Sequence, residues 1–283
     1  MKIVLKIASL AARVLPGKIK TAFYRSPKLA SKIRGALNAA SPNGFTNIEV
    51  AGGLLHGYHL NLDMQTEKDY WLGTYEVNLQ TMIRTLCRKN MVVYDIGANI
   101  GYISLLFAKQ TGKSGQVFAF EPLPENCSRL EKNIALNNLE NSITLIQAAV
   151  IDKSGSTTFM VHKSGAMGKA VGSKGRDEEY LMQIIVPAVS LDDFVFTQNN
   201  PPPKLIKMDI EGGEVLAIKG MQRTLKEVKP VILVEIHSHQ ALECLWRDFR
   251  DADYQLFRIE KEISVIENPA DLGEKTYALA KPK

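Results

Sequence analysis

The sequence predicts an α/β protein built on a doubly wound, mostly parallel sheet. The first observation is that short, almost wholly apolar segments alternate with amphipathic ones over residues 91–150 and again over residues 203–239, which is typical of parallel strands buried on both faces. The second is that 283 residues with 45% hydrophobic and 23% charged side chains suffice for one large or two small folded domains. The third is that no apolar stretch approaches the roughly 18 residues of a membrane-spanning helix.

The elements of the sheet follow from this alternation, and we assign them to one domain over residues 91–283. Strands are expected at residues 91–97, 116–121, 142–150, 203–212 and 230–239, helices at 102–110, 125–138 and 214–228, and a closing pair of strands at 253–260 and 276–281. Between residues 155 and 190, two strand-like segments flank a stretch rich in Gly and Lys. This pattern predicts an inserted hairpin with a mobile tip.

Residues 1–46 are expected to form a basic helical extension. They hold nine Lys or Arg and no Asp or Glu, although the net charge of the whole chain is only +5. Apolar residues at helical spacing predict a short amphipathic helix; they are Ile3, Ile7, Leu10 and Val14. The apolar face either adsorbs to an anionic membrane, through residues 1–34, or packs on the body of the protein, and we favour packing.

Residues 47–90 are expected to lead into the sheet domain. Apolar alternation on either side of Gly52-Gly53 predicts a small hairpin over residues 47–63. A stripe of apolar side chains then predicts a helix over residues 68–90.

Cysteine spacing and charge disfavour several classes of protein. Cys87, Cys127 and Cys244 are far apart in the sequence, so neither a disulfide framework nor a thiolate zinc site is indicated, and a reducing, cytoplasmic location fits. Beyond the basic extension, acids outnumber bases, and no N-P-P-Y-like loop that could handle a base follows the "KMD" segment. Methylation of nucleic acid is therefore disfavoured.

The loop "YDIGANIGY", which lies between an expected strand and helix, is the sharpest local signal. Ligands of doubly wound sheets bind beyond the carboxyl ends of the strands, but Asn99 stands where the G-x-G-x-x-G dinucleotide fingerprint has its second glycine. Asp95 would repel a pyrophosphate and attract a cation, and Glu121 ends the next strand, where an acid bonds ribose hydroxyls in dinucleotide-binding folds. S-adenosylmethionine, which carries an ammonium and a sulfonium and no phosphate, suits this loop. The alternative is that Asp95 caps a helix and Glu121 is a solvated strand end.

Five segments together resemble the FkbM-type S-adenosylmethionine-dependent methyltransferases. The segments are "VVYDIGANIGYISLLFA", "GQVFAFEPLPEN", "AVSLDDF", "LIKMDIEGGEVLAIKGM" and "ILVEIH". The resemblance runs from about Leu72 to His239 and implies a class I methyltransferase fold, with a seven-stranded sheet whose last strand is antiparallel, and methylation of hydroxyls on sugars or polyketides. Gly213 departs from the Ala expected in the family's E-G-A-E motif, which slightly loosens the start of the following helix.

The cofactor site is expected to combine the glycine loop with neighbouring strand ends. Its residues are Asp95, Gly97, Ala98, Asn99, Gly101, Tyr102, Glu121, Pro122 and Asp209. Tyr75 and Glu76 are added through the resemblance, because they match the family's Y-E element. By physical reasoning alone, Glu76 is an acid on a helix surface.

Two further strand ends carry the residues that we expect to react. Asp209, Glu211 and Glu214 follow one strand, and "VEIHSH" places Glu235, His237 and His239 at alternate positions, on one face of the next strand. In an open parallel sheet, these ends lie beside the glycine loop.

The catalytic residues expected there are His237, Glu235, Asp209 and Glu211. An alcohol needs a proton acceptor, and His237, with an unperturbed pKa of about 6.5, is the first choice. Glu235 or Asp209 would orient its ring or stabilise its imidazolium. A metal ion held by Glu235, His237, His239 and Asp209 is a rival that we do not favour, because alternating polar residues are also typical of a solvated crevice.

The function expected is O-methylation of a hydroxyl on a saccharide, a glycolipid or a secondary metabolite. A nicotinamide-dependent oxidoreductase on a related fold and a non-catalytic nucleotide-binding protein are the alternatives. The partner is a small-molecule or glycan acceptor, and the insertion over residues 162–179 is either a lid over it or a solvated loop. The basic extension adds the hypothesis that the acceptor is a lipid-linked glycan at the inner membrane face.

Overall fold

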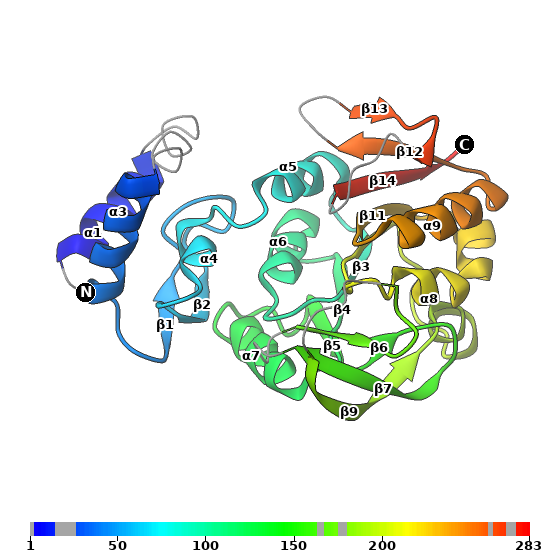
Figure 1. Cartoon of the computed structure of the whole chain (residues 1–283), viewed down its shortest axis with the longest axis horizontal. Coiled ribbons are helices and arrows are strands. Elements are labelled where there is room, and N and C mark those ends of the chain that lie inside the picture. Colours follow the sequence, from blue (N-terminus) through cyan, green and yellow to red (C-terminus); the bar gives the residue numbers. More distant parts are fainter. Residues whose placement is uncertain (1–2, 15–26, 163–166, 175–179, 260–262, 270–275) are drawn as a thin grey trace. The chain divides into compact units, whose positions relative to one another are not determined.

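A computed structural model describes residues 3–14, 27–162, 167–174, 180–259, 263–269 and 276–283 (Figure 1). The chain divides into two compact units. The smaller comprises Met1–Gln80 and Lys132–Asn138, and the larger comprises Thr81–Glu131 and Leu139–Lys283. The division at residues 46 and 90 stays a prediction.

The larger unit contains the expected doubly wound sheet. Its strands lie in the order β13-β12-β14-β11-β10-β3-β4-β5. Their bounds are β3 Val92–Ile96, β4 Gln116–Phe120, β5 Ile143–Ile146, β10 Leu205–Met208, β11 Val231–Ile236, β12 Tyr254–Ile259, β13 Ile263–Val265 and β14 Thr276–Pro282. Neighbours from β11 to β5 are parallel, whereas β14 is antiparallel to both β11 and β12, which confirms the antiparallel last strand. The sheet has one strand more than expected, because the short and wholly exposed β13 pairs with β12 at the edge.

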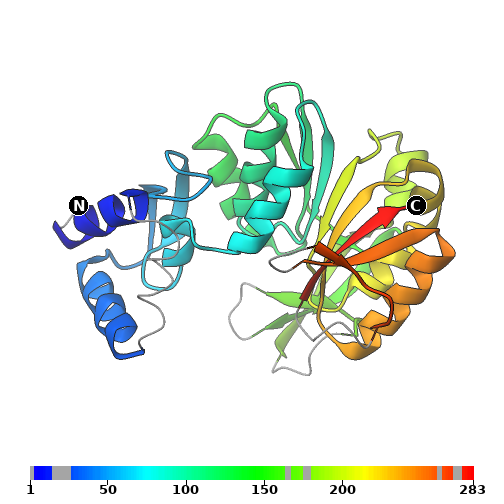
Figure 2. The same ribbon diagram turned by 90° about the horizontal axis from the view of Figure 1, so that it is seen from above.

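The topology brings four strand ends together. The chain moves from β3 to β4 and β5 in one direction along the sheet, and β10 and β11 lie on the other side of β3. The strand order therefore reverses at β3, and ligands of such sheets bind beyond the carboxyl ends at this point. Helix α6 (Tyr102–Thr111) covers one face of the sheet, while α8 (Glu214–Lys219) and α9 (His239–Asp251) cover the other (Figure 2).

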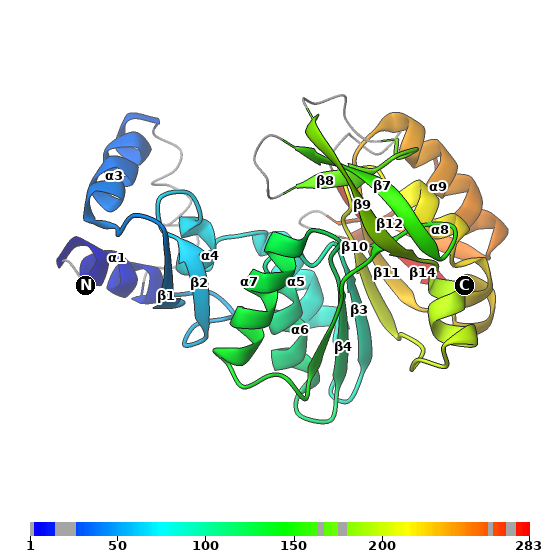
Figure 3. The ribbon, with the colours of Figure 1, turned by 90° about the horizontal axis from the view of Figure 1, so that it is seen from below.

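The insertion is larger than the expected hairpin. Strands β7 (Gly155–His162) and β9 (Tyr180–Val189) pair antiparallel as predicted. They are joined by β6 (Ala149–Val150) and β8 (Gly168–Ala170) in a separate sheet with the order β6-β9-β7-β8 (Figure 3). This sheet has its own small apolar cluster, which includes Phe159. The tip of the predicted lid, at residues 163–166 and 175–179, lies outside the described residues.

The smaller unit contains the expected hairpin, with a longer connection. Strands β1 (Phe45–Glu49) and β2 (His59–Asp63) pair antiparallel, and residues 50–58, rather than Gly52-Gly53 alone, connect them. The helix expected over residues 68–90 is divided into α4 (Lys68–Leu72) and α5 (Val77–Leu86). The left-handed φ of Gly73 (71°) and of Glu76 (47°) interrupts it.

Helices α1 (Ile3–Val14) and α3 (Pro27–Ala40) complete the smaller unit. The amphipathic helix is confirmed as α1, whereas the packing of its apolar stripe on the body of the protein stays a prediction. The exposed fractions are 74% for Ile3, 64% for Ile7, 62% for Leu10 and 67% for Val14. The helix buries Leu5 and Ala12. Among the described residues, no helix has both the length and the apolarity to cross a bilayer.

Candidate active site

The turn after β3 is shaped by close backbone approach. Gly97 has a left-handed φ of 78°, and a Cβ atom there would lie 2.0 Å from the backbone oxygen of Asp209. Asn99 (φ 50°) and Gly101 (φ 90°) are also left-handed. The turn therefore passes directly against the end of β10, and any side chain at residue 97 would prevent this contact.

Glu121 fastens this turn to the end of β4. Its carboxylate accepts hydrogen bonds from the backbone N–H of Asn99 (2.9 Å), the backbone N–H of Leu123 (3.0 Å) and Nδ2 of Asn126 (3.2 Å). The side chain is buried, and burial raises the pKa of Glu121 in spite of these bonds. Ala98, Tyr102 and Pro122, also expected at the cofactor site, are buried around the same turn.

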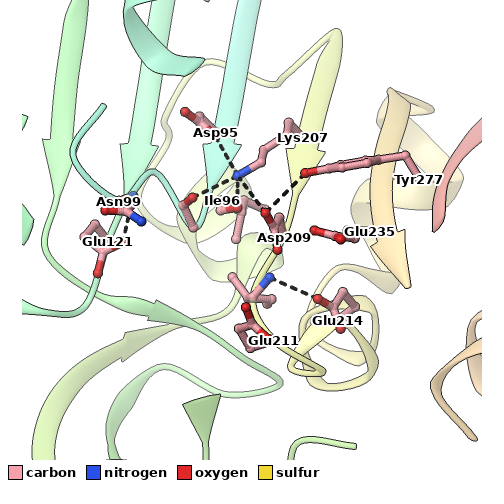
Figure 4. Close-up of polar contacts among 12 residues, drawn as sticks. Asp95, Ile96, Asn99, Glu121, Lys207, Asp209, Glu211, Glu214, Glu235 and Tyr277 are labelled. Carbon is pink, nitrogen blue, oxygen red and sulfur yellow. Dashed lines mark hydrogen bonds and ion pairs between the residues drawn. The ribbon is translucent and has the colours of Figure 1, made fainter. Parts of the chain in front are cut away.

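Asp95 has a partner that the sequence analysis did not name, Lys207 (Figure 4). Nζ of Lys207 lies 3.4 Å from Oδ1 of Asp95 and donates a hydrogen bond of 2.8 Å to the carbonyl of Gly97. The Oγ of Ser104 donates to Oδ2 of Asp95, whose side chain is fully buried. Burial raises the pKa of Asp95, while Lys207 opposes that rise. A charged residue inside the apolar segment "LIKM" was the available signal for Lys207.

Asp209 connects the turn to the reacting end. Its carboxylate lies 4.0 Å from Nζ of Lys207, accepts a hydrogen bond from the hydroxyl of Tyr277 (3.2 Å) and lies 3.4 Å from Nε2 of His237. Burial acts to raise the pKa of Asp209, but the positive charges of Lys207 and His237 outweigh it and the net shift is downward. Asp209 is therefore ionised at neutral pH.

His237 lies among carboxylates. Its Nδ1 is 3.1 Å from Oε1 of Glu214, and its Nε2 is 3.6 Å from Oε2 of Glu211 and 3.6 Å from Oε2 of Glu235. Burial alone would lower the pKa of His237, but the hydrogen bond and charge of Glu214, with the charges of Asp209 and Glu235, raise it to about 9. The expectation of a pKa of about 6.5 is not met. In this arrangement both ring nitrogens are protonated at neutral pH, and the ring is positively charged.

Glu214 holds the ring through Nδ1, while Asp209 and Glu235 lie beside Nε2 and stabilise the protonated ring, as expected. Glu214 is fully buried, and its Oε1 also accepts a hydrogen bond from the backbone N–H of Ile210 (3.0 Å). Its position at the first residue of α8 was the available signal, since an acid in the first turn of a helix bonds free backbone N–H groups.

The predicted alternation beyond β11 is wrong for His239. The strand ends at Ile236, and His239 is the first residue of α9, where its 61% exposed side chain pairs with Glu243. Because α9 begins at His239, directly after the extended N-cap residue Ser238, His239 does not continue the alternation of the strand that carries Glu235. Tyr75 and Glu76 belong to the smaller unit, and their role at the cofactor site stays a prediction.

The insertion contacts the reacting end. The backbone N–H of Lys174 donates a 2.9 Å hydrogen bond to the carbonyl of Gly212, and the hydroxyl of Ser238 donates to the carbonyl of Lys174. These bonds join the described part of the insertion to both strand ends that carry the acids.

The fold and the site define a class I S-adenosylmethionine-dependent methyltransferase. The antiparallel β14, the strand order and the glycine turn with an acid at the end of the next strand are the features that define it. The Methyltransferase FkbM domain family matches residues 95–258. The chain belongs to this family.

The chain is similar in sequence to two proteins named as methyltransferases, and in fold to a solved structure. The chain is 28% identical over 186 residues to the hexuronic acid methyltransferase AglP of Haloferax volcanii, which covers 64% of this chain and 72% of AglP. It is 27% identical over 173 residues to the methyltransferase sdnD of Sordaria araneosa, which covers 52% of this chain and 66% of sdnD. A crystal structure of a methyltransferase FkbM from Methylobacillus flagellatus is similar with a TM-score of 0.46 and 19% identity, over 78% of this chain and 56% of that one.

Proposed function

We propose that this methyltransferase transfers its methyl group to a hydroxyl of a saccharide, a glycolipid or a related secondary metabolite. The observation that carries the proposal is the convergence of Asp209, Glu211 and Glu235 on Nε2 of His237, at 3.4–3.6 Å. Carboxylates accept hydrogen bonds from hydroxyl groups and favour a cationic methyl donor. AglP, named as a methyltransferase of hexuronic acid, supports a sugar acceptor.

The residues around the glycine turn fit the donor. Gly97 and Gly101 have no side chain that would obstruct a ligand at the turn, and Glu121 lies at the end of β4. The acids near Asp209 supply negative charge, which favours a cationic ligand over a phosphate. S-adenosylmethionine, when bound, supplies a methyl group on a positively charged sulfur. Tyr75 and Glu76 are proposed to add to this site on the strength of the family's Y-E element.

Glu235 is proposed as the proton acceptor at the reacting end. Its side chain is 18% exposed and lies at the end of β11, so it can meet an acceptor hydroxyl. Its carboxylate takes the hydroxyl proton as the oxygen forms a bond to the methyl carbon. His237 holds Asp209, Glu211 and Glu235 in place through its position among them, and so is a positioning residue.

The test is a methyl-transfer assay with radiolabelled donor and a panel of neutral sugars and uronic acids. We expect a neutral sugar to gain one methyl group that resists mild base, because an ether survives conditions that hydrolyse an ester. Glu235→Gln should reduce kcat by roughly 10²- to 10⁴-fold, the usual contribution of a general base. His239→Gln, which changes an exposed histidine two residues beyond His237, should retain full activity.

Two outcomes contradict the proposal. A base-labile product formed only on uronic acids would show that the acceptor atom belongs to a carboxylate. A folded protein that binds S-adenosylhomocysteine but methylates no sugar or diol would exclude the acceptor class.

The insertion, through Lys174, is proposed as one wall of the acceptor site.

We further propose that residues 1–34 hold the enzyme against an anionic membrane from the cytoplasmic side, where a lipid-linked glycan would be the acceptor. The apolar stripe of α1 is exposed, and the nine bases of the extension, which lacks acids, complement anionic headgroups. Cys87, Cys127 and Cys244 are free, which favours the reducing side of the membrane.

A further inference from the structure

Three side chains at the reacting end have the arrangement of ligands around one ion. Asp209, Glu211 and His237 each offer one ligand atom, and these atoms all lie within 4.8 Å of one another. Nε2 of His237 is 3.4 Å from Oδ1 of Asp209 and 3.6 Å from Oε2 of Glu211. These distances exceed the usual length of an N–H···O hydrogen bond, roughly 2.7–3.2 Å. Two ligands bound to one ion at about 2.1 Å lie about 3.0 Å apart at a right angle and about 3.4 Å apart at a tetrahedral angle.

The histidine is oriented in the way that metal ligands are. Its Nδ1 lies 3.1 Å from Oε1 of Glu214, so Nδ1 keeps its hydrogen, and Nε2, which faces Asp209 and Glu211, is the nitrogen whose proton an ion would displace. Histidines that bind metals almost always donate their other ring N–H to such a carboxylate or carbonyl, which fixes the tautomer. The side chain is only 1% exposed.

A second, independent feature is a buried carboxylate oxygen behind the ring, Oε2 of Glu214, that lacks a hydrogen-bond partner among the described residues. Glu214 is fully buried. A buried carboxylate oxygen without a hydrogen-bond partner is costly. A divalent cation on the far side of the imidazole would offset the charge of Glu214 together with those of Asp209 and Glu211.

We propose that Asp209, Glu211 and His237 bind a divalent cation, with Glu214 as the positioning residue behind the histidine. One imidazole with two carboxylates suits a first-row transition ion such as Mn²⁺. The set differs from the metal alternative of the sequence analysis, because Glu211 replaces the exposed His239. Glu235, 3.6 Å from Nε2, remains beside the ion as the proton acceptor.

The role of the ion rests on the proposed function. Bound to an acceptor hydroxyl, it would withdraw electron density from the oxygen and ease loss of the proton. The proton passes to Glu235, the oxygen forms a bond to the methyl carbon, and the electron pair of the breaking carbon–sulfur bond stays on sulfur, which leaves S-adenosylhomocysteine. An ion here would also be able to bind two neighbouring hydroxyls of a sugar and hold them in one orientation.

The test is titration of the full-length chain with Mn²⁺, after EDTA treatment and dialysis, with free Mn²⁺ followed by electron paramagnetic resonance. We expect one ion per chain, displaced by competing Zn²⁺. Glu214→Gln should weaken binding by roughly 10- to 100-fold, the range seen for residues that support a metal ligand, and Glu211→Gln and His237→Gln, which remove ligands, should weaken it at least as much. The matched control, His239→Gln, should bind as the unchanged chain does.

Two results would overturn the metal site. One is a folded chain that binds none of Mn²⁺, Mg²⁺ and Zn²⁺. The other is that Glu211→Gln and His237→Gln bind Mn²⁺ as strongly as the unchanged chain. Glu211 is 26% exposed, so Glu211→Gln retains the test if His237→Gln fails to fold. The sugar panel separates the two proposals. If the chain binds Mn²⁺ but methylates no sugar, the metal site is supported and the proposed function is wrong. If the chain methylates a sugar but binds no ion, the proposed function is supported and the metal site is wrong.

Discussion

Two regions of the molecule invert the usual rule of burial, in opposite directions. The reacting end buries charged side chains, with Asp95 and Glu214 fully inaccessible and Lys207 only 3% exposed. Helix α1 exposes large apolar side chains, with Ile7 at 64% and Leu10 at 62%. Charged residues are almost never fully buried unless they are paired, whereas a stripe of exposed apolar residues marks a contact surface.

The two regions differ in how strongly a substitution there should affect the stability of the folded chain. The buried charges compensate one another, so removal of one leaves its partner uncompensated in a medium of low polarity. Substitutions in the exposed stripe of α1 should change the free energy of unfolding little, because its side chains contribute little to the core. Changes at the reacting end should therefore affect stability, while changes on α1 should affect association alone.

The largest effect is expected for Lys207→Met. Asp95 would stay buried after the loss of its counter-ion at 3.4 Å, and breaking a buried pair in this way usually costs about 3–5 kcal/mol. Urea unfolding measures the loss. The matched control is Lys204→Met, which removes the same charge from an exposed position just before β10 and should change the free energy of unfolding by less than about 0.5 kcal/mol.

The double variant Asp95→Asn with Lys207→Met sharpens this expectation. Removal of both charges leaves no uncompensated ion, so part of the lost stability should return. A Lys207→Met chain that unfolds with the free energy of the unchanged chain would show that Asp95 is not held by Lys207, and the contrast with α1 would disappear.

A smaller effect is expected for Gly97→Ala. The new Cβ would lie 2.0 Å from the oxygen of Asp209, so the turn must move away from the end of β10. We expect a loss of more than about 2 kcal/mol, since left-handed strain alone costs roughly 1–2 kcal/mol, together with weaker binding of S-adenosylhomocysteine by calorimetry. Gly172→Ala is the control, because its φ is 92° and its nearest neighbour, Cδ1 of Leu216, is 3.8 Å away.

The control separates strain from crowding. Gly172→Ala should lose only the cost of strain and keep its affinity for S-adenosylhomocysteine. Equal affinity in Gly97→Ala would indicate that the turn after β3 does not shape the cofactor site.

The position of the site could be predicted from the sequence, because strand order in a doubly wound sheet fixes which ends meet. Asp95, Glu121 and Asp209 were placed correctly at the ends of adjacent strands on this ground. The pairing of charges could not be predicted in the same way. Lys207 is opposite Asp95 only because β10 and β3 are in a register that pairs them, and register between strands distant in sequence leaves no local pattern.

The local geometry beyond the strand ends could not be predicted from the sequence either. Glu235 and His237 follow strand alternation, but the chain turns into α9 after Ile236, which separates His239 from them. Glu214 reaches the ring because α8 begins immediately after the turn at Glu211, whose φ of 54° is left-handed. Amphipathicity predicted α1 but not the partner of its apolar face, since the same pattern serves packing and adsorption.

The smallest effect concerns α1, and it tests the other half of the comparison. Ile7→Ser with Leu10→Ser should reduce co-sedimentation with vesicles that contain anionic phosphatidylglycerol by at least about tenfold, because each buried methylene contributes about 0.8 kcal/mol. The free energy of unfolding should stay unchanged, in contrast to Lys207→Met. Ile185→Ser, at a 78% exposed apolar residue of β9, is the matched control and should sediment normally. Equal sedimentation of all three proteins, or sedimentation that ignores the anionic lipid, would leave the stripe without a membrane partner.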